Sequence, residues 1–306
     1  MQDGCQPIVP TRWIVPVMSI ADDPLPDLVR NLRSPLPDIR ARSARALGRL
    51  GWLAHDALPL LLNALTDVDA NVRESAAQAV GQMGPQALPH LAKMLKHQDK
   101  YVRRNAVWAL GKLGPLAKSV ISDLCAVLKD VDPRTASGAA QALGCMGADA
   151  SDAIPALTEA MRGTNIVLCR LAAKALSQVG RPALPALIAH LRHRDPFVRG
   201  EAALALGWMG ATAVPAVPAL MEAMRPVRTS TLRAGPIQAQ DCTPTTPDEQ
   251  VPPSPEETSR AYAAQALGRI GPEAIQAVAT LSKAALDDNE QVRQSAQQAL
   301  RMVQVS

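Results

Sequence analysis

The sequence contains very few aromatic residues, and this scarcity already limits the fold. Phe, Trp and Tyr make up 2% of the 306 residues, whereas hydrophobic residues as a class make up 47%. A β-sandwich or β-barrel would need aromatic and β-branched side chains in its core. Ala, Leu, Val and Met must therefore close the interior, which is typical of tightly packed helices.

Other signals are also missing. The five cysteines form no C-x-x-C pair and are widely spaced, so we expect reduced thiols in a cytoplasmic protein and no metal site. The apolar run from Trp13 to Ile20 is broken by Pro16 and follows no basic segment, so we expect no signal peptide, no transmembrane span and no membrane partner. A net charge of +4 is too small to indicate a nucleic-acid-binding protein by itself.

What the sequence does contain is an internal repeat. The stretch V-R-G-E-A-A-L-A-L-G-W-M-G, at residues 198–210, recurs mostly at intervals of 30 or 33 residues. Each copy places apolar residues at helical spacing, which predicts a helix with one buried face. A fixed period of this kind indicates one elongated array rather than separate globular domains. The copies begin at Ile39, Val72, Val102, Thr135, Leu168, Val198, Ser259 and Val292.

Each copy carries signals for a helix start and a helix end. Asp or Asn stands three residues before most copies, as a helix N-cap, although Leu36 and Glu256 occupy this position in two of them. Glycines in G-x-x-G spacing follow most copies and predict a left-handed cap and a close turn. A-[LIV]-P-x-[LV] segments then begin another helix, with proline in or near its first turn. We predict about eight helix pairs, each with a first helix and a second, repeat-bearing helix.

The predicted domain organisation has three parts. Residues 1–20 lack the period and form an irregular N-terminal extension, and residues 21–306 form the repeat array. The array is interrupted between the two helices of pair seven, where residues 226–256 contain seven prolines and no period. Such a segment is typical of a disordered insert.

The repeat resembles a known family. The pattern D-x-x-V-R-x-x-A-x-x-A-L-G-x-[LMI]-G followed by A-[LIV]-P-x-L is similar to HEAT repeats, specifically to the short repeats of the phycobilisome-lyase type. This resemblance covers about nine tenths of the chain. It implies an all-α, armadillo-like, right-handed α-solenoid whose second helices line the concave face. It does not fix a function, because the family includes scaffolds, bilin lyases, DNA glycosylases and hydroxylases.

An arginine recurs four residues after the capping position. An Asp–Arg pair at this spacing can form within a repeat or reach the adjacent one, and we interpret the column as a ladder that joins the repeats. The ladder is interrupted in pairs four and five, where Ala136 and Cys169 stand instead. The arginines are Arg40, Arg73, Arg103, Arg199, Arg260 and Arg293.

The second helices also predict a binding surface. Positions −5, −2 and +2, counted from the Leu or Val of the Ala-Leu or Ala-Val pair, form one stripe opposite the core. Aromatic and apolar residues on such a wet face are typical of a protein-binding hot spot. The candidate partner-binding residues are Trp108, Lys112, Leu171, Lys174, Glu201, Leu204, Trp208, Tyr262 and Arg269, and a secondary basic patch comprises Arg42, Arg45 and Arg49.

The sequence offers little support for catalysis. Hydroxylases of the family bind iron through His-Glu dipeptides, and no His-Glu pair occurs here. His190 and His193 stand three residues apart with no further ligand at metal spacing, so we interpret them as part of a solvated face. The glycines match no nucleotide-binding motif. A nucleic-acid partner is disfavoured because only Arg42, Arg45 and Arg49 resemble part of a basic groove.

We therefore hypothesise a non-catalytic scaffold or adaptor that binds a protein partner on its concave face, with no cofactor and no metal. The alternative is a phycobilin lyase or bilin chaperone of the E/F type, with a phycobiliprotein as partner. In that case Trp208, Tyr262, Leu204 and Arg269 would hold the bilin. The chain lacks the Y-Y-A-A-W-W-type helix associated with the main lyase subunits, which counts against this alternative.

The insert yields a first testable prediction. A disordered loop contributes little packing, and loop length changes stability only slowly. Replacing residues 226–256 by a short Gly-Ser turn should therefore leave the thermal unfolding transition nearly unchanged in circular dichroism. A large loss of stability would show that the insert belongs to the folded array.

Overall fold

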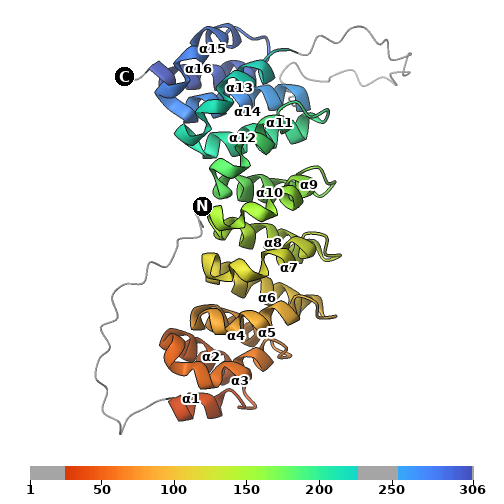
Figure 1. Cartoon of the computed structure of the whole chain (residues 1–306), viewed down its shortest axis with the longest axis vertical. Coiled ribbons are helices and arrows are strands. Elements are labelled where there is room, and N and C mark those ends of the chain that lie inside the picture. The colour runs from red at the N-terminus through yellow and green to blue at the C-terminus, as the bar shows by residue number, and fades with distance from the viewer. Residues whose placement is uncertain (1–24, 227–253, 305–306) are drawn as a thin grey trace, which may run out of the picture. The chain divides into compact units, whose positions relative to one another are not determined.

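A computed structural model describes residues 25–226 and 254–304 (Figure 1). Over these residues the chain is all-α, and its sixteen α-helices form the eight predicted pairs. The fold class is therefore confirmed as an all-α solenoid. The extension at residues 1–20 and residues 227–253 of the predicted insert lie outside the described residues.

The first unit ends at Ala183 and contains five helix pairs. Its helix pairs follow one another in chain order (Figure 1), and consecutive second helices pack against each other. The first helices are α1 (Leu25–Asn31), α3 (Leu58–Ala64), α5 (Leu88–Met94), α7 (Ile121–Val127) and α9 (Ile154–Met161). The second helices are α2 (Pro37–Leu50), α4 (Ala70–Met83), α6 (Lys100–Leu113), α8 (Pro133–Cys145) and α10 (Ile166–Val179).

The second unit begins at Leu184 and contains three helix pairs. Its first helices are α11 (Leu184–His190), α13 (Val217–Ala223) and α15 (Val278–Ala284). Its second helices are α12 (Pro196–Trp208), α14 (Pro255–Ile270) and α16 (Glu290–Gln304). The predicted insert therefore separates α13 from α14, the two helices of pair seven.

Short 3₁₀ segments connect each second helix to the following first helix. They are η2 (Gly51–Ala57), η3 (Pro85–Ala87), η4 (Gly114–Val120), η5 (Gly147–Ala153), η6 (Arg181–Ala183), η7 (Gly210–Ala216) and η8 (Gly271–Ala277). The second glycine of each G-x-x-G pair has a positive φ, for example 59° at Gly51, which other residues adopt at a cost. The prolines of α3, α5 and α9 lie in the first turn, as predicted, whereas Pro215 of the predicted segment at 213–217 lies within η7.

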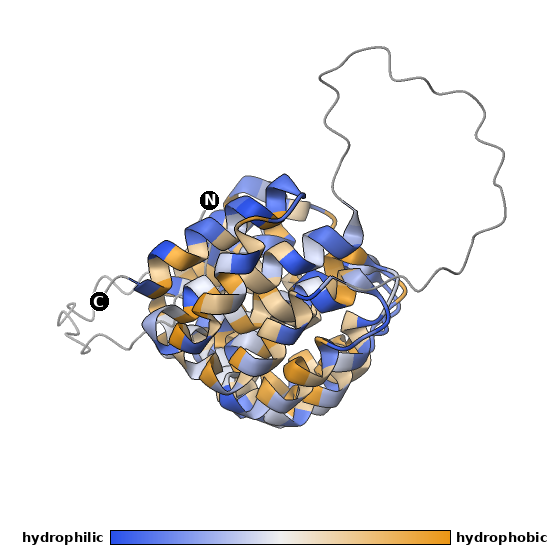
Figure 2. Ribbon diagram, turned by 90° about the horizontal axis from the view of Figure 1, so that it is seen from above, coloured by the Kyte–Doolittle hydropathy of each residue, from blue (hydrophilic) through white to orange (hydrophobic). Residues whose placement is uncertain are grey.

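The first glycine of each G-x-x-G pair has a different role, which is close packing between second helices. A Cβ atom added to Gly48 would lie 2.7 Å from the Cα of Ala79, and one added to Gly268 would lie 2.8 Å from the Cα of Ala299. No side chain fits at these distances, so the helix backbones touch directly. Hydrophobic and hydrophilic stretches alternate along the helices (Figure 2), and the recurrent Ala and Leu positions are buried in every pair except at Ala46 and Leu300.

The predicted N-caps are confirmed at Asp69, Asp99, Asp132, Asn165 and Asp195, whose side chains accept backbone N–H groups of the following turn. Helix α14 differs from the prediction. Its N-cap is Ser254, which forms a capping box with Glu257, so Glu256 lies inside the helix. The C-terminal boundary of the predicted insert at 256 is therefore wrong, because residues 254–256 belong to the array. A deletion that leaves stability unchanged must therefore end at residue 253, since Glu256 pairs with Arg199.

The arginine column is a ladder, but its acceptors are not the capping residues. The Arg40 guanidinium donates two hydrogen bonds to Asp67, and that of Arg103 donates two to Asp130, each acceptor lying two residues before the next N-cap. The same arginines donate to backbone carbonyls of the loop before their own helix, as Arg103 does to His97. Each complete rung therefore fastens two consecutive loops.

The interruption of the ladder is compensated locally at one position. The Cys169 thiol donates to the carbonyl of Gly163, at 3.1 Å, which lies six residues earlier. Arg103 donates to a carbonyl at the same offset. A thiol therefore fastens this loop where the arginine is missing.

The rung between Arg103 and Asp130 gives a second prediction. The two side chains are 12% and 7% exposed, so Arg103→Met would leave a nearly buried carboxylate without its partner. We expect a loss of about 3 kcal/mol in the free energy of unfolding, measured by urea denaturation. The control Lys129→Met removes an exposed ion pair with Glu159 and should cost less than about 1 kcal/mol. Equal losses would contradict a structural role for the rung.

The same rung predicts a pH dependence. The hydrogen bonds from Arg103 hold the pKa of Asp130 below its ordinary value. A carboxyl group with a lowered pKa stabilises the folded state above the unfolded pKa of about 3.9, and this contribution is lost as the pH falls through the folded value. The stability difference between wild type and Arg103→Met should be complete near pH 7 and shrink below about pH 4. A difference that does not change with pH would exclude this ion pair as its source.

Candidate functional site

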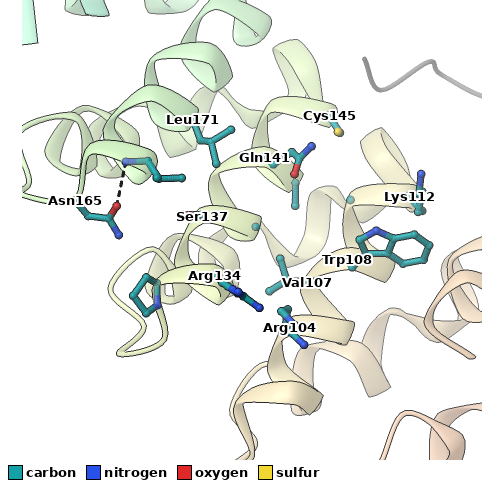
Figure 3. A pocket seen from close by; sticks show the side chains of 15 residues that line it. Arg104, Val107, Trp108, Lys112, Arg134, Ser137, Gln141, Cys145, Asn165 and Leu171 are labelled. Carbon is teal, nitrogen blue, oxygen red and sulfur yellow. Dashed lines mark hydrogen bonds between the residues drawn. The ribbon is translucent and has the colours of Figure 1, made fainter. Parts of the chain in front are cut away.

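A groove runs across the second helices α6, α8 and α10 of the first unit. Its volume is about 550 Å³, and side chains from all three helices line it (Figure 3). The middle helix creates the hollow, because its outward positions are the small residues Ser137 and Gly138 followed by Gln141. Bulkier side chains stand on both sides, with Trp108 on α6 and Leu171 on α10 (Figure 3).

The groove has an apolar floor. The side chain of Val107 lies against α8, and a Cβ atom added to Gly138 would be 3.1 Å from its Cγ1. Val167 and Leu171 continue the apolar surface on α10, and Val167 is 59% exposed. Trp108 is 37% exposed. Apolar side chains are therefore available to a ligand on both sides of the groove, from Trp108 on α6 and from Val167 and Leu171 on α10.

Cationic side chains border this floor. The Arg104 guanidinium lies 5.0 Å from the centre of the Tyr101 ring, and the Lys112 ammonium lies 5.0 Å from the centre of the Trp108 ring. Arg134, at the N-terminal end of α8, is exposed and also lines the groove. Cations over aromatic faces are held in place without a neutralising partner, so their charge remains available.

The structure brings together only part of the predicted stripe. Trp108, Lys112 and Leu171 line the groove, whereas Lys174 is exposed on α10 outside its lining. In the second unit, Trp208 is 44% exposed on α12 and Leu204 is half-buried. The Tyr262 ring and the Arg269 stem of α14 lie against Gly200 and Gly207 of α12. These four residues form a separate cluster on two neighbouring helices.

The prediction for Glu201 is wrong. Its side chain is 2% exposed, so it does not belong to a wet surface. Ser75 and Ser295 occupy the same position, −5, and are also buried, whereas Arg42 at this position is exposed. The repeat position alone therefore does not determine whether the side chain is exposed.

The three arginines of the predicted secondary basic patch lie on one helix. Arg42, Arg45 and Arg49 are all exposed on α2 and line a second hollow of about 480 Å³ next to α1. Asn31 of α1 contributes to the opposite wall. Fewer apolar side chains line this hollow than line the α6–α8–α10 groove.

The predicted stripe did not include the residues at the N-terminal end of the groove. Arg134 and Val167 both stand nine residues before the leucine of their helix, which is one helical turn before the predicted stripe. Tyr101 holds the same position on α6. Extending the predicted stripe by one helical turn toward the N-terminus would have included these residues.

The cysteines and histidines differ from expectation at two positions. Cys145 lines the groove and is disulfide-bonded, so the expectation of reduced thiols is wrong at this residue, whereas Cys125 and Cys169 are thiols. His190 is buried and stacks on His193 with the ring centres 6.0 Å apart, so it is not part of a solvated face. Within residues 25–226 and 254–304, no three His, Cys, Asp or Glu side chains form a metal-binding group. None of the helices described there is both long and apolar enough to span a membrane.

The fold and the repeated second helices define a helical-repeat protein. The sequence matches the HEAT-repeat family over residues 25–99, 88–168 and 154–239, so the chain belongs to that family. A comparison with curated proteins gave no match.

Several solved structures align with most of the chain. The complex of CpcE and CpcF of phycocyanin lyase from Nostoc sp. is 20% identical, with 96% of this chain and 100% of that chain covered and a TM-score of 0.43. Human deoxyhypusine hydroxylase in complex with glycerol is 23% identical, with 91% and 95% covered and a TM-score of 0.36. An engineered protein is 22% identical, with 91% and 78% covered and a TM-score of 0.43. At such low scores these similarities carry no argument about function.

Proposed function

We propose that this chain is a HEAT-repeat scaffold or adaptor that binds a protein partner along the groove of α6, α8 and α10. One observation carries the proposal, namely the exposed Trp108 beside the apolar floor of a groove of about 550 Å³. Tryptophan and arginine are enriched among residues that dominate protein–protein binding energies. The partially exposed Trp108, with Val167 and Leu171 across the groove, supplies apolar area, and the surrounding cations orient the partner.

Repetition supports binding rather than catalysis. Each repeat presents the same outward helix positions at a regular spacing, so variation at those positions changes a surface without disturbing the core. At one such position, −2, the second helices of pairs three to five carry Trp108, Gln141 and Lys174, while their Ala and Leu positions remain constant. An extended surface of this kind suits a protein segment better than a small substrate.

Three tryptophans provide a matched test of the proposal. Trp108, Trp208 and Trp52 are each 37–55% exposed, and they lie in the groove, on α12 and on η2 respectively. We expect Trp108→Ala to lose a partner that in-cell cross-linking and mass spectrometry recover with wild type, by a factor of about ten or more. Trp52→Ala should retain it, and all variants should keep the wild-type thermal unfolding transition.

The outcome for Trp208→Ala decides how far the site extends. Loss with Trp208→Ala alone would move the site to the cluster with Leu204, Tyr262 and Arg269 on the second unit. An identical set of cross-linked proteins for wild type, Trp108→Ala and Trp208→Ala would exclude both surfaces and the scaffold proposal with them.

The second candidate function is that of a phycobilin lyase or bilin chaperone. The groove volume of about 550 Å³ supports it, because small-molecule sites commonly measure about 300–1,000 Å³. Arg104 or Arg134 would face the propionate groups of a linear tetrapyrrole, and Trp108 would lie against a pyrrole ring. Arg269 and Tyr262 remain the corresponding candidates on the second unit.

A binding test separates the two candidates. If this second function holds, co-expression with phycocyanobilin synthesis should give a purified protein with visible absorbance, and Trp108→Ala should reduce that absorbance. Colourless wild-type protein from cells that contain the free bilin would exclude the chaperone and lyase function. Protein-partner cross-linking would not be affected by that result.

A further inference from the structure

The second helices around the groove carry positive charge only. Helices α6, α8 and α10 contain no Asp or Glu, whereas α2, α4, α12, α14 and α16 each contain at least one. The cations of the three helices include Lys100, Arg104, Lys112, Arg134 and Lys174, in addition to Arg103, which pairs with Asp130. The three helices themselves therefore contribute only positive charge.

The first-helix side of the same repeats is different, because its cations are neutralised by carboxylates of the next repeat. Lys96 pairs with Asp123, Lys118 pairs with Asp149, and Lys129 pairs with Glu159, at 2.9, 3.1 and 3.2 Å. The repeat spacing therefore allows a carboxylate to lie opposite a lysine of the preceding repeat. Within the described part of the chain, Arg104, Lys112 and Arg134 form no such ion pair.

One carboxylate does interact with the basic end of the groove. The pKa of Asp132 is lowered, first by the hydrogen bond from the Thr135 side chain and also by the charges of Lys100 and Arg104. Asp132 is occupied as the N-cap of α8, however, where it accepts both the N–H and the hydroxyl of Thr135. It contributes one negative charge to a region where three cations surround the Tyr101 ring within 5.0–5.4 Å.

We infer that the groove binds an acidic peptide segment that also carries bulky apolar side chains. Carboxylates of the segment meet Arg104 and Arg134 at one end and Lys112 at the other, and apolar side chains lie on Trp108, Val167 and Leu171. This inference rests on the proposed protein-binding function and specifies the chemistry of the partner. A phosphate-rich nucleic acid fits less well, because base stacking needs several aromatic platforms and the groove lining contains one aromatic residue, Trp108.

The spacing of the cations limits the segment. Arg104 and Lys112 are eight residues apart on α6, which corresponds to about 12 Å along the helix axis. Two acidic residues of the segment at that separation stand about two turns apart in a helix or about four residues apart in an extended chain. Three neighbouring helices at 8–10 Å spacing extend across about 20 Å, which a helical peptide of about sixteen residues covers.

The experiment uses a fluorescein-labelled peptide of about sixteen residues with alternating Glu-Glu and Leu-Leu pairs, and measures fluorescence anisotropy with the full chain. We expect saturable binding that weakens between about 0.1 and 0.3 M NaCl. Peptides with Lys in place of Glu, or with Ser in place of Leu, should bind at least tenfold more weakly. An oligonucleotide of about fifteen thymidines should compete poorly.

Matched charge variants locate the binding site. Arg104→Gln combined with Arg134→Gln should weaken the Glu-Leu peptide at least tenfold. The control Arg162→Gln combined with Arg181→Gln removes the same charge from exposed positions outside the groove and should change affinity less than twofold. Lys112→Gln, at an exposed position, provides an independent variant if the half-buried Arg104 proves necessary for folding.

Other outcomes would overturn the inference or count against the scaffold function. Equal binding to the groove and control variants, no binding of the Glu-Leu peptide, or stronger binding of the oligonucleotide would overturn the inference. A cross-linked partner that depends on Trp108 but contacts the groove with a basic or uncharged segment would overturn it while leaving the scaffold function intact. Groove-dependent peptide binding without any Trp108-dependent partner would support the acidic-segment chemistry and count against the scaffold function.

Discussion

The close approach of neighbouring second helices is the constraint on which the rest of the structure depends. Glycine on one helix faces alanine on the next, as in Gly48 with Ala79 and Gly268 with Ala299, and the added Cβ atom would overlap the neighbouring backbone. Backbones in direct contact leave little volume for large core side chains. This explains how a chain with 2% aromatic residues closes its interior, and it leaves the few tryptophans free for the surface.

Close helix packing alone does not fix the loops, and the arginine ladder supplies that restraint. Each complete rung joins a guanidinium, a carboxylate of the next repeat and carbonyl groups of its own loop, as Arg40 does with Asp67 and Ser34. Fixed loops determine where each second helix begins, and thus which residues reach the outer face. The groove depends on this register, because Arg134 and Val167 lie in the first turns of α8 and α10.

The two sides of the first unit distribute charge differently, although both are built from the same repeat. Ion pairs between consecutive repeats neutralise Lys118 and Lys129 on the first-helix side. On the second-helix side, Arg104 and Arg134 border an apolar hollow that results from Gly138. A surface that combines available positive charge with exposed apolar area is costly to leave uncovered, and a complementary acidic segment would satisfy both features.

The sequence by itself determined the repeat period, the eight helix pairs, the capping residues of most second helices and the arginine column, because each depends on neighbours within one turn or one period. It also identified Trp108, Lys112 and Leu171 as surface residues. Only the tertiary structure decided that these three share a groove, that Arg134 belongs to it and that Glu201 is buried. Those properties depend on the angle and distance between neighbouring helices. A periodic pattern assigns each residue a face of its own helix, but it cannot specify what the next helix places opposite that face.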